Sequence, residues 1–246
     1  MTVDTDDQLE GLRRVGVVAA TALTEVCAAA GVGVTTRDLD DIGSSIFRMY
    51  GARSEPRVFK SFPGTLCISV NEEAVHGVPA LRPIMPGDVI KIDVTPILDG
   101  FVADTARTIV IGDDATSHRL VASAERALDA GIAAARPRRR TRDIGRAIDR
   151  IARQSGFKVL REVGGHGLGH GMHEAPHVPN WDDPRGRDVL HEGLVLAVEP
   201  IISVSDEWLT EGDDGWLLKT IGGSFAAHVE HTIVVGDGDP IVLTAA

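Results

Sequence analysis

Three segments of the first half of this chain recur, in the same order, in the second half. The pairs are Thr36–Leu39 with Thr141–Ile144, Pro86–Asp93 with Glu192–Glu199, and Arg107–Asp113 with His231–Asp237. Because the order of the three pairs is kept, we predict two halves of like structure, residues 7–115 and 116–240. Because no Pro-, Gly- or Ser-rich linker separates the two halves, we expect one domain, residues 1–246, with internal pseudo-symmetry.

Each half is expected to begin with two helices and to continue with antiparallel strands. Helical spacing of apolar residues predicts helices at 7–30, ended by Gly31, at 36–50 with Thr36 as N-cap, at 117–135, and from 141 to a glycine at 156. Strands are expected at 57–60, 65–70, 89–94 and 101–111. The helices would cover one face of the strands, and the other faces of the two halves would meet at a shared cleft. This is an α+β arrangement.

Composition excludes several classes of function. The formal net charge of −11 argues against general nucleic-acid binding, which needs a basic surface. No apolar run approaches the roughly 18 residues of a membrane span, and the acidic N-terminus is unlike a secretory signal. Two cysteines, Cys27 and Cys67, fit a reducing cytoplasm. The basic segment Arg136–Arg142 is expected to be a solvated loop, with an anionic partner such as a ribosome surface as the alternative.

The segment Gly164–Pro176 holds three histidines and five glycines in thirteen residues. This glycine density disfavours a helix, so we expect an irregular strand or loop that allows close approach of a ligand. A neutral imidazole binds divalent metals well. One histidine of this segment is therefore expected to bind a metal and another to contact substrate.

The repeat also places four acidic residues. Asp93 and Glu199 stand at matching positions, each at the end of an apolar strand, and Asp104 and Glu230 each precede a Thr-Ile-Val run by an even number of residues. Equal parity puts Asp104 and Glu230 on the same side of their strands. If the halves pack face to face, four carboxylates meet in one buried cleft. Such a cluster needs divalent metals or shared protons, and His166 favours metals.

A set of four carboxylates and one imidazole has room for two cations. It lacks the cysteines of a structural zinc site. Two metals close together can lower the pKa of a water molecule and polarise a carbonyl group. Taken one at a time, each acid is more typical of a turn at a strand end. The repeat is what makes the metal interpretation the stronger one.

Eight short motifs carry a family resemblance over residues 7–243. They are Asn71–Pro79, Ile92–Thr95, Asp99–Thr105, Gly165–Gly169, His173–Pro176, Val198–Pro200, Asp214–Trp216 and Glu230–Thr232. In these motifs the chain resembles the type I methionine aminopeptidases of bacteria, in their short form, which have the pita-bread fold. In that fold, two pseudo-symmetric halves of helices and antiparallel strands surround a central metal cleft.

The resemblance implies two divalent metal ions, without identifying them among Co, Mn, Fe, Zn and Ni. The implied ligands are Asp93, Asp104, His166, Glu199 and Glu230. Asp104 and Glu230 would bridge both ions, with Asp93 mainly on one ion and His166 and Glu199 on the other.

The resemblance also implies catalytic roles for three residues. His173 would hydrogen-bond the scissile carbonyl oxygen and stabilise the oxyanion. His76 would lie near the scissile amide and the bound amine. Glu199 would take a proton from the attacking water and pass it to the leaving amine.

An apolar pocket sized for one unbranched thioether side chain is implied as well. Matching positions place Phe59, Phe62, Cys67, Met172 and Trp216 around it, each with plain core packing as the alternative. Phe59 and Phe62 stand where relatives often carry tyrosine, and Met172 stands where an aromatic residue is common. A methionine at the wall would make the pocket more adaptable.

A further departure from the family is His228, where glutamine is usual. It lies two residues before Glu230, so we expect it to point the same way and to contact the metal site from behind a ligand. A partly exposed histidine is the alternative. His231, by contrast, is expected to point away and be structural, and His170 to lie at the surface.

The expected function is removal of the initiator methionine from nascent polypeptides whose second residue is small. The expected enzyme is a cytoplasmic monomer without membrane or specific nucleic-acid binding. A sister hydrolase of the aminopeptidase P or prolidase type is one alternative, although those usually carry an additional N-terminal domain. A binding protein on an inactive scaffold is another, although such proteins lose metal ligands that are all present here.

Overall fold

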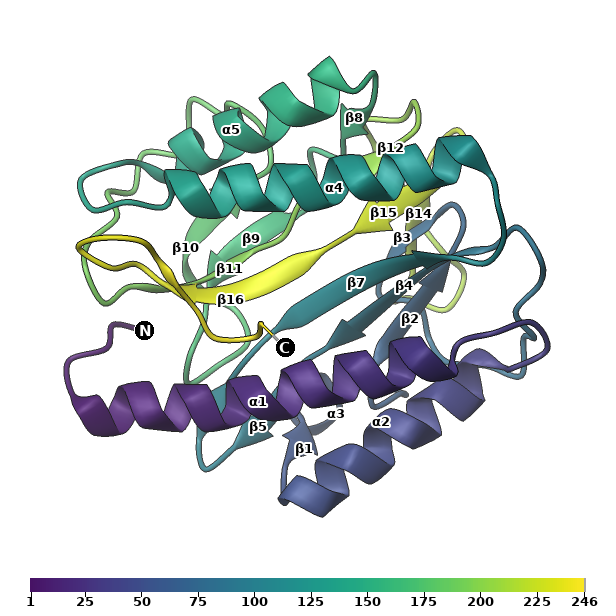
Figure 1. The fold of residues 1–246 in the computed structure, drawn as a ribbon, viewed down its shortest axis with the longest axis horizontal. Coiled ribbons are helices and arrows are strands. Elements are labelled where there is room, and N and C mark those ends of the chain that lie inside the picture. Colours follow the sequence, from purple (N-terminus) through teal and green to yellow (C-terminus); the bar gives the residue numbers. More distant parts are fainter. Residues whose placement is uncertain (246) are drawn as a thin grey trace.

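The computed structural model describes residues 1–245, and its centre is one continuous antiparallel sheet (Figure 1). The order across the sheet is β10-β9-β11-β16-β7-β4-β2, with β17 beside β16. The strands are β2 (Cys67–Val70), β4 (Val89–Val94), β7 (Thr105–Val110), β9 (Gly164–Gly167), β10 (Glu174–Pro179), β11 (Val195–Val198), β16 (Glu230–Val234) and β17 (Ile241–Val242).

Two antiparallel pairs of helices flank this sheet (Figure 1). They are α1 (Asp6–Ala29) with α2 (Thr36–Tyr50), and α4 (Ala115–Ala134) with α5 (Thr141–Gln154). The first pair packs through Leu23, Val26 and Phe47 against the buried side chains of β2 and β4. The second pair packs in the same way against β10, β11 and β16. The predicted α+β class with helices covering antiparallel strands is confirmed.

The segments that recur in the two halves of the sequence occupy equivalent places in the sheet. In the first half β4 lies beside β7, and in the second half β11 lies beside β16. The two halves join where β7 pairs with β16, through Glu230 opposite Ala106 and His231 opposite Thr105. The pseudo-symmetry axis therefore passes between these two strands.

This junction corrects one expectation. The halves do not stack strand face to strand face but join edge to edge in one sheet. The physical reason is that β7 and β16 would otherwise each present an unpaired row of backbone donors and acceptors in the middle of the molecule. The carboxylates consequently lie on one face of a single sheet.

The predicted helices are confirmed, with corrections at their ends. Helix α1 ends at Ala29, followed by Ala30 in extended conformation, so Gly31 is not its terminator. The N-cap of α2 is Thr35, one residue before the prediction, because its hydroxyl accepts the N–H of Asp38 while the Asp38 side chain accepts the N–H of Thr35. The helix ends as expected at Gly51, with a φ of 70°.

Two strand predictions need correction. Residues 57–60 do not form a strand, because Ser54 caps a short helix, α3 (Glu55–Phe59), with Pro56 in its first turn. The strand expected at 101–111 is interrupted, leaving β6 (Phe101–Val102) and then β7. Asp104 falls in the interruption. The strand expected at 65–70 begins at Cys67, and the one at 89–94 is confirmed as β4.

Three small sheets surround the main one, in the orders β1-β5-β6, β15-β12-β8 and β13-β14-β3. Their remaining strands are β1 (Arg53–Ser54), β3 (Glu73–Val75), β5 (Pro96–Leu98), β8 (Lys158–Val159), β12 (Ile201–Ser203), β13 (Leu209–Glu211), β14 (Leu218–Thr220) and β15 (Ala226–His228). None of the helices within residues 1–245 has the length and apolar character that crossing a membrane requires.

Candidate metal centre and substrate pocket

Strand register brings the first acids together. Asp93 on β4 is paired with Cys67 on one side and with Ala106 on the other, and Ala106 is paired with Glu230. Directly paired residues of neighbouring strands point to the same face of a sheet. Asp104, two residues before Ala106, shares this face by parity. Residues from three separate strands are thereby aligned in one row.

The second half completes the row. On β11, Ala197 is paired with His166 of β9 and with Thr232 of β16. Thr232 lies two residues after Glu230, and Glu199 lies two residues after Ala197, so His166 and Glu199 face the same side as the acids. The two parts of the chain therefore converge on one face of the sheet.

The side chains converge closely. Ligand atoms of Asp104, His166 and Glu230 all lie within 4.8 Å of one another. Oε1 of Glu199 lies 3.4 Å from Nε2 of His166. All four side chains are buried. Asp93 joins this cluster from β4, because its strand partner Ala106 is also paired with Glu230 and Asp93 lines the same cavity as the other four residues.

The buried acids oppose one another's ionisation. Burial, reinforced by the charge of neighbouring carboxylates, raises the pKa of Asp104 and the pKa of Glu230 well above their usual values. Burial also raises the pKa of Asp93. Burial acts on Glu199 too, but the adjacent imidazoles of His228 and His166 outweigh it, so the pKa of Glu199 is lowered. Such a cluster requires compensating positive charge to ionise.

Unsatisfied polar atoms show that the cluster fits divalent metals. Within residues 1–245, Oδ1 of Asp93, Oε1 of Glu230 and Nε2 of His228 are buried without a hydrogen-bond partner. A buried oxygen or nitrogen of this kind is costly unless something binds it. Carboxylate oxygens with imidazole nitrogens are a donor set that first-row divalent metals accept. The residues present therefore fit such ions.

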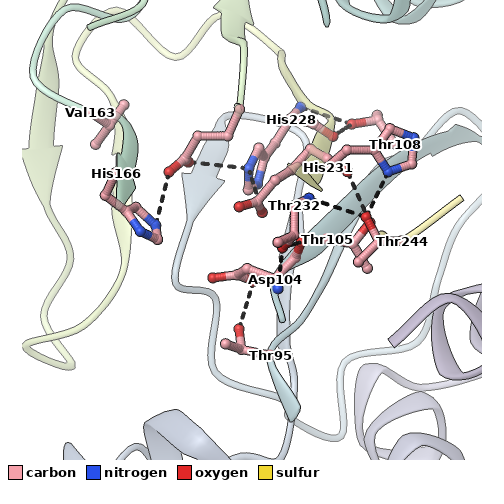
Figure 2. A network of polar contacts seen from close by, with 12 residues as sticks. Thr95, Asp104, Thr105, Thr108, Val163, His166, His228, His231, Thr232 and Thr244 are labelled. Atoms are coloured by element: carbon pink, nitrogen blue, oxygen red, sulfur yellow. Dashed lines mark hydrogen bonds and ion pairs between the residues drawn. The ribbon is translucent and has the colours of Figure 1, made fainter. Parts of the chain in front are cut away.

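Threonines hold the two halves of this cluster in place across the junction (Figure 2). The hydroxyl of Thr232 donates to the carbonyl oxygen of Asp104 at 2.7 Å and accepts the N–H of Asp104 at 2.8 Å. The hydroxyl of Thr105 donates to the carbonyl oxygen of Glu230 at 2.9 Å. Thr95 donates to Oδ1 of Asp104 at 2.8 Å, which orients that carboxylate. Sequence reasoning assigned no role to these threonines, although Thr95, Thr105 and Thr232 all lie in quoted motifs.

His228 lies against the carboxylates as expected. Its Nε2 atom is 3.4 Å from Oε2 of Glu199 and 3.7 Å from Oε2 of Glu230. The side chain is buried, which excludes the partly exposed alternative. The backbone of His228 is fixed by Thr108, whose hydroxyl donates to the His228 carbonyl oxygen at 2.6 Å. His231 points away from the cluster, toward Thr244, with 2.9 Å between the His231 Nδ1 and Thr244 Oγ1 atoms (Figure 2).

A cavity of about 520 Å³ opens beside the acids. Four of the five predicted pocket residues, Phe62, Cys67, Met172 and Trp216, line it. The rings of Phe62 and Trp216 meet edge to face with centroids 5.3 Å apart. Burial raises the pKa of the Cys67 thiol well above its usual value, so that side chain is a neutral apolar wall. This end of the cavity suits an apolar side chain.

The structure does not bring Phe59 into this pocket. Its side chain is 59% exposed, and it does not line the cavity. The reason is the short helix α3, which replaces the expected strand and turns Phe59 outward. Lys60, next to it, lines the cavity instead, together with Glu162 and His177. Sequence reasoning missed these three polar residues, because no periodicity or motif marks them.

His76 and His173 both line the cavity on the side of the acids. His76 directly follows β3, in the left-handed region with a φ of 61°. The ring of His173 lies edge to face with that of His166, 4.4 Å between centroids. Partial burial and the neighbouring His166 lower the pKa of His173 to about 4, so this imidazole is neutral at pH 7. A neutral imidazole can donate one hydrogen bond and accept one.

Carboxylates fix the segments that carry three of the pocket walls. Oδ1 of Asp40 accepts the N–H groups of the two residues before Cys67, both at 2.8 Å. Oδ1 of Asp214 accepts the N–H groups of Trp216 and Leu217, at 2.9 and 2.8 Å. Oε1 of Glu174 does the same for the two residues before Met172. No sequence pattern predicts hydrogen bonds of this kind, from backbone N–H groups to side-chain carboxylates.

Comparison with known proteins identifies the family. Residues 10–237 match metallopeptidase family M24. The chain belongs to this family of metallopeptidases. Among curated relatives, the methionine aminopeptidase 2 of Bacillus subtilis is 41% identical over 99% of both chains. A methionine aminopeptidase of Staphylococcus epidermidis is 38% identical over 99% of this chain and 98% of its own.

Solved structures support the assignment of this chain to the M24 metallopeptidases. The methionine aminopeptidase of Thermotoga maritima superposes with a TM-score of 0.96 at 32% identity, over the full length of both chains. The prolidase of Pyrococcus furiosus shares the fold with a TM-score of 0.78 at 20% identity. This chain covers only 66% of that prolidase. The pita-bread fold predicted from the motifs is confirmed.

Proposed function

We propose that this M24 metallopeptidase is a methionine aminopeptidase that removes the initiator methionine from nascent polypeptides whose second residue is small. The observation that carries this proposal is an apolar pocket, walled by Phe62, Cys67 and Trp216, directly beside a buried cluster of metal-ligating side chains. The full-length relatives at 41% and 38% identity, both named methionine aminopeptidase, support the same activity.

The residues that would hold two divalent ions are Asp93, Asp104, His166, Glu199 and Glu230. Their convergence on one face of the sheet and the unsatisfied atoms of Asp93 and Glu230 support this assignment. When bound, the ions supply a water nucleophile of lowered pKa and polarise the scissile carbonyl group.

The side chains around the cluster divide the remaining work. His173, neutral at pH 7, donates a hydrogen bond to the oxygen of the scissile carbonyl and stabilises the negative charge that develops there. His76 contacts the scissile amide and the bound amine. The Glu199 carboxylate, held ionised by its two histidine neighbours, accepts a proton from the attacking water and delivers it to the leaving amine.

Pocket shape accounts for the choice of substrate. An unbranched thioether side chain fills an apolar pocket and gains contacts with the aromatic edges of Phe62 and Trp216. Met172, an adaptable side chain, forms part of the wall. The exclusion of large second residues would come from steric limits beyond this pocket.

We further propose that the enzyme acts as a monomer, one catalytic unit of residues 1–246, in the cytoplasm. Two cysteines without a disulfide partner in residues 1–245 support a reducing compartment. The segment Arg136–Arg142, in which Arg138, Arg139 and Arg140 are exposed, is the surface we propose for approach to an anionic partner such as the ribosome.

Peptide cleavage tests the proposed function. The purified protein, loaded in turn with Mn²⁺, Co²⁺ or Fe²⁺, should release methionine from Met-Ala-Ser and leave Xaa-Pro peptides intact. Cleavage of Xaa-Pro peptides alone would assign the prolidase type instead. Tight metal binding without cleavage of either peptide would favour a binding protein on this scaffold.

A further inference from the structure

The loop between β9 and His173 carries two proposed substrate contacts but has little conformational preference of its own. Residues 168–172 include two glycines, and Gly169 has a φ of 145°, a conformation that side chains rarely adopt. Met172 and His173 at its end both line the substrate cavity. Because sequence alone leaves this loop flexible, other groups must hold it.

The backbone N–H groups of the loop are held mainly by two glutamates. Oε1 of Glu174 accepts the N–H of His170 and the N–H of Gly171, both at 2.9 Å. Oε1 of Glu55 accepts the N–H of Met172 at 3.3 Å. Three successive N–H groups therefore end on carboxylate oxygens, where hydrogen bonds are stronger than between neutral groups.

Glu55 reaches the loop from the other half of the molecule. It begins α3, is only 4% exposed, and its backbone N–H donates to the carbonyl oxygen of Thr95 at 3.0 Å. The side chain of Thr95 in turn orients Asp104. The loop is thus tied to the element that carries an acid of the metal cluster, across the pseudo-symmetry axis.

Glu174 is also anchored on its second oxygen. Oε2 of Glu174 forms an ion pair with the α-amino group of Met1, which also donates to the carbonyl oxygen of Leu168. Glu174 follows His173 directly in the chain. A carboxylate fixed at this point therefore restrains the residue before it as well as the loop.

We propose that Glu174 and Glu55 are positioning residues that clamp residues 168–173 so that His173 and Met172 face the substrate. The proposal rests on the proposed function for its effect on turnover. Glu55 does not line the substrate cavity, whereas Glu174 does, and in this scheme both act through the loop rather than on the substrate. Their loss leaves His173 present but displaced or mobile.

The clamp is separable from metal binding. His166 sits on β9, which is paired on one side with β10 and on the other with β11. Those ladders hold His166 without the loop. Loosening the loop should therefore lower turnover while the affinity for metal stays the same, a combination that general destabilisation of the fold does not produce.

The test compares Glu174→Ala, Glu174→Gln, Glu55→Gln and the double variant Glu174→Ala/Glu55→Ala, in the full chain with any tag at the C-terminus. Amide hydrogen exchange at residues 170–172 reports on the clamp directly, and kcat and KM on Met-Ala-Ser report on its effect. Asp114→Ala is the matched control, because Asp114 also accepts a backbone N–H, that of Ser117 at 2.7 Å, at the start of α4.

We expect Glu174→Ala to exchange faster at residues 170–172 and to lose about 100-fold in kcat, as misplacing a catalytic group by about an ångström does. Its affinity for Mn²⁺ should stay within about twofold of the wild type. Glu174→Gln keeps an acceptor oxygen, so it should recover most of the lost kcat. Asp114→Ala should leave both the loop exchange and kcat unchanged.

Unchanged exchange in the double variant would overturn the clamp, as would faster exchange with wild-type kcat. An equal loss of kcat in Asp114→Ala would show that the loss comes from general destabilisation of the fold, which would also overturn the clamp. If the wild type itself fails to cleave Met-Ala-Ser, the proposed function fails. The exchange measurement then still decides whether the two glutamates hold the loop.

Discussion

His228 and His166 grip the same carboxylate from two sides. The Nε2 atom of His228 lies 3.4 Å from one oxygen of Glu199, and the Nε2 atom of His166 lies 3.4 Å from the other. A carboxylate held between two imidazoles has little freedom to turn. Glu199 is therefore presented to the cluster in one orientation. At the position of His228, where glutamine is usual in the resembled family, this chain carries a second imidazole.

Replacing His228 should weaken metal binding. We expect His228→Ala to lower affinity for Co²⁺ by about 10- to 100-fold, because groups that orient a ligand typically contribute that much. The Co²⁺ affinity of His228→Gln should lie between those of His228→Ala and the wild type, because the glutamine amide can still donate a hydrogen bond to Glu199. Competition with a chelator measures the affinity. His231→Asn, which faces away toward Thr244, is the control, and unchanged affinity in His228→Ala would refute a contribution of His228.

Removing the charge of Asp104 should remove metal and activity together. Asp104→Asn keeps the shape of the side chain and an acceptor for Thr95 but loses an anionic ligand at the centre of the cluster. We expect the number of bound metal ions, counted by mass spectrometry, to fall by at least one per chain, with a large loss of turnover. Asp99→Asn, an exposed aspartate paired with Arg14, should retain both. Full metal content in Asp104→Asn would argue against its role as a bridging ligand.

Removing the imidazole of His173 should separate chemistry from metal binding. His173→Ala is expected to lose about 10²- to 10³-fold in kcat, the usual effect of deleting one donor to an oxyanion. Metal content should stay at the wild-type level, because the ligands of the cluster remain. Steady-state kinetics on Met-Ala-Ser with parallel metal counting checks both. His118→Ala, at the surface, serves as control, and a change in KM alone would assign His173 to binding rather than to the transition state.

Lys91 should make stability depend on pH. Burial lowers the pKa of this lysine to about 7, although Glu73 and Glu72 act in the opposite direction. Because the unfolded chain keeps a pKa near 10.5, it binds the proton more readily between these values, and the stability of the folded protein rises with pH there. Below pH 7 Lys91 is charged in both the folded and the unfolded chain, so the free-energy cost of burying its charge no longer changes with pH. Over the full interval the change in the free energy of unfolding is about 5 kcal/mol.

The Lys91→Met variant isolates this contribution. Urea unfolding of metal-free protein from pH 6 to 10 should show wild-type stability rising relative to the variant, with most of the rise above pH 7. The variant also loses the hydrogen bond from Lys91 Nζ to the carbonyl oxygen of Asn71, at 2.7 Å, which lowers its stability by a similar amount at every pH. Parallel curves for the two proteins would contradict the lowered pKa.

The sequence predicted most of what depends on local pattern. Helical spacing located α1, α2, α4 and α5 within a few residues, because each has an apolar stripe to bury. Strand parity correctly placed Asp104 with Glu230 and turned His231 away. Errors occurred where a local signal competed with a stronger one, as at residues 57–60, where the cap at Ser54 and Pro56 start a helix.

The sequence by itself determined the repeated halves, the carboxylates each half contributes, and the family to which they point. These are encoded by spacing along the chain, and spacing fixes which side of a strand a residue faces. Only the tertiary structure decided that β7 pairs with β16 edge to edge, that Phe59 turns outward, and that Glu55 and Glu174 hold the loop before His173. The β7–β16 junction and the Glu55 contact join residues far apart in the chain, and the closing of backbone hydrogen bonds selects their partners. Phe59 and Glu174 are placed by short-range contacts, and neither kind of contact leaves a periodic pattern in the sequence.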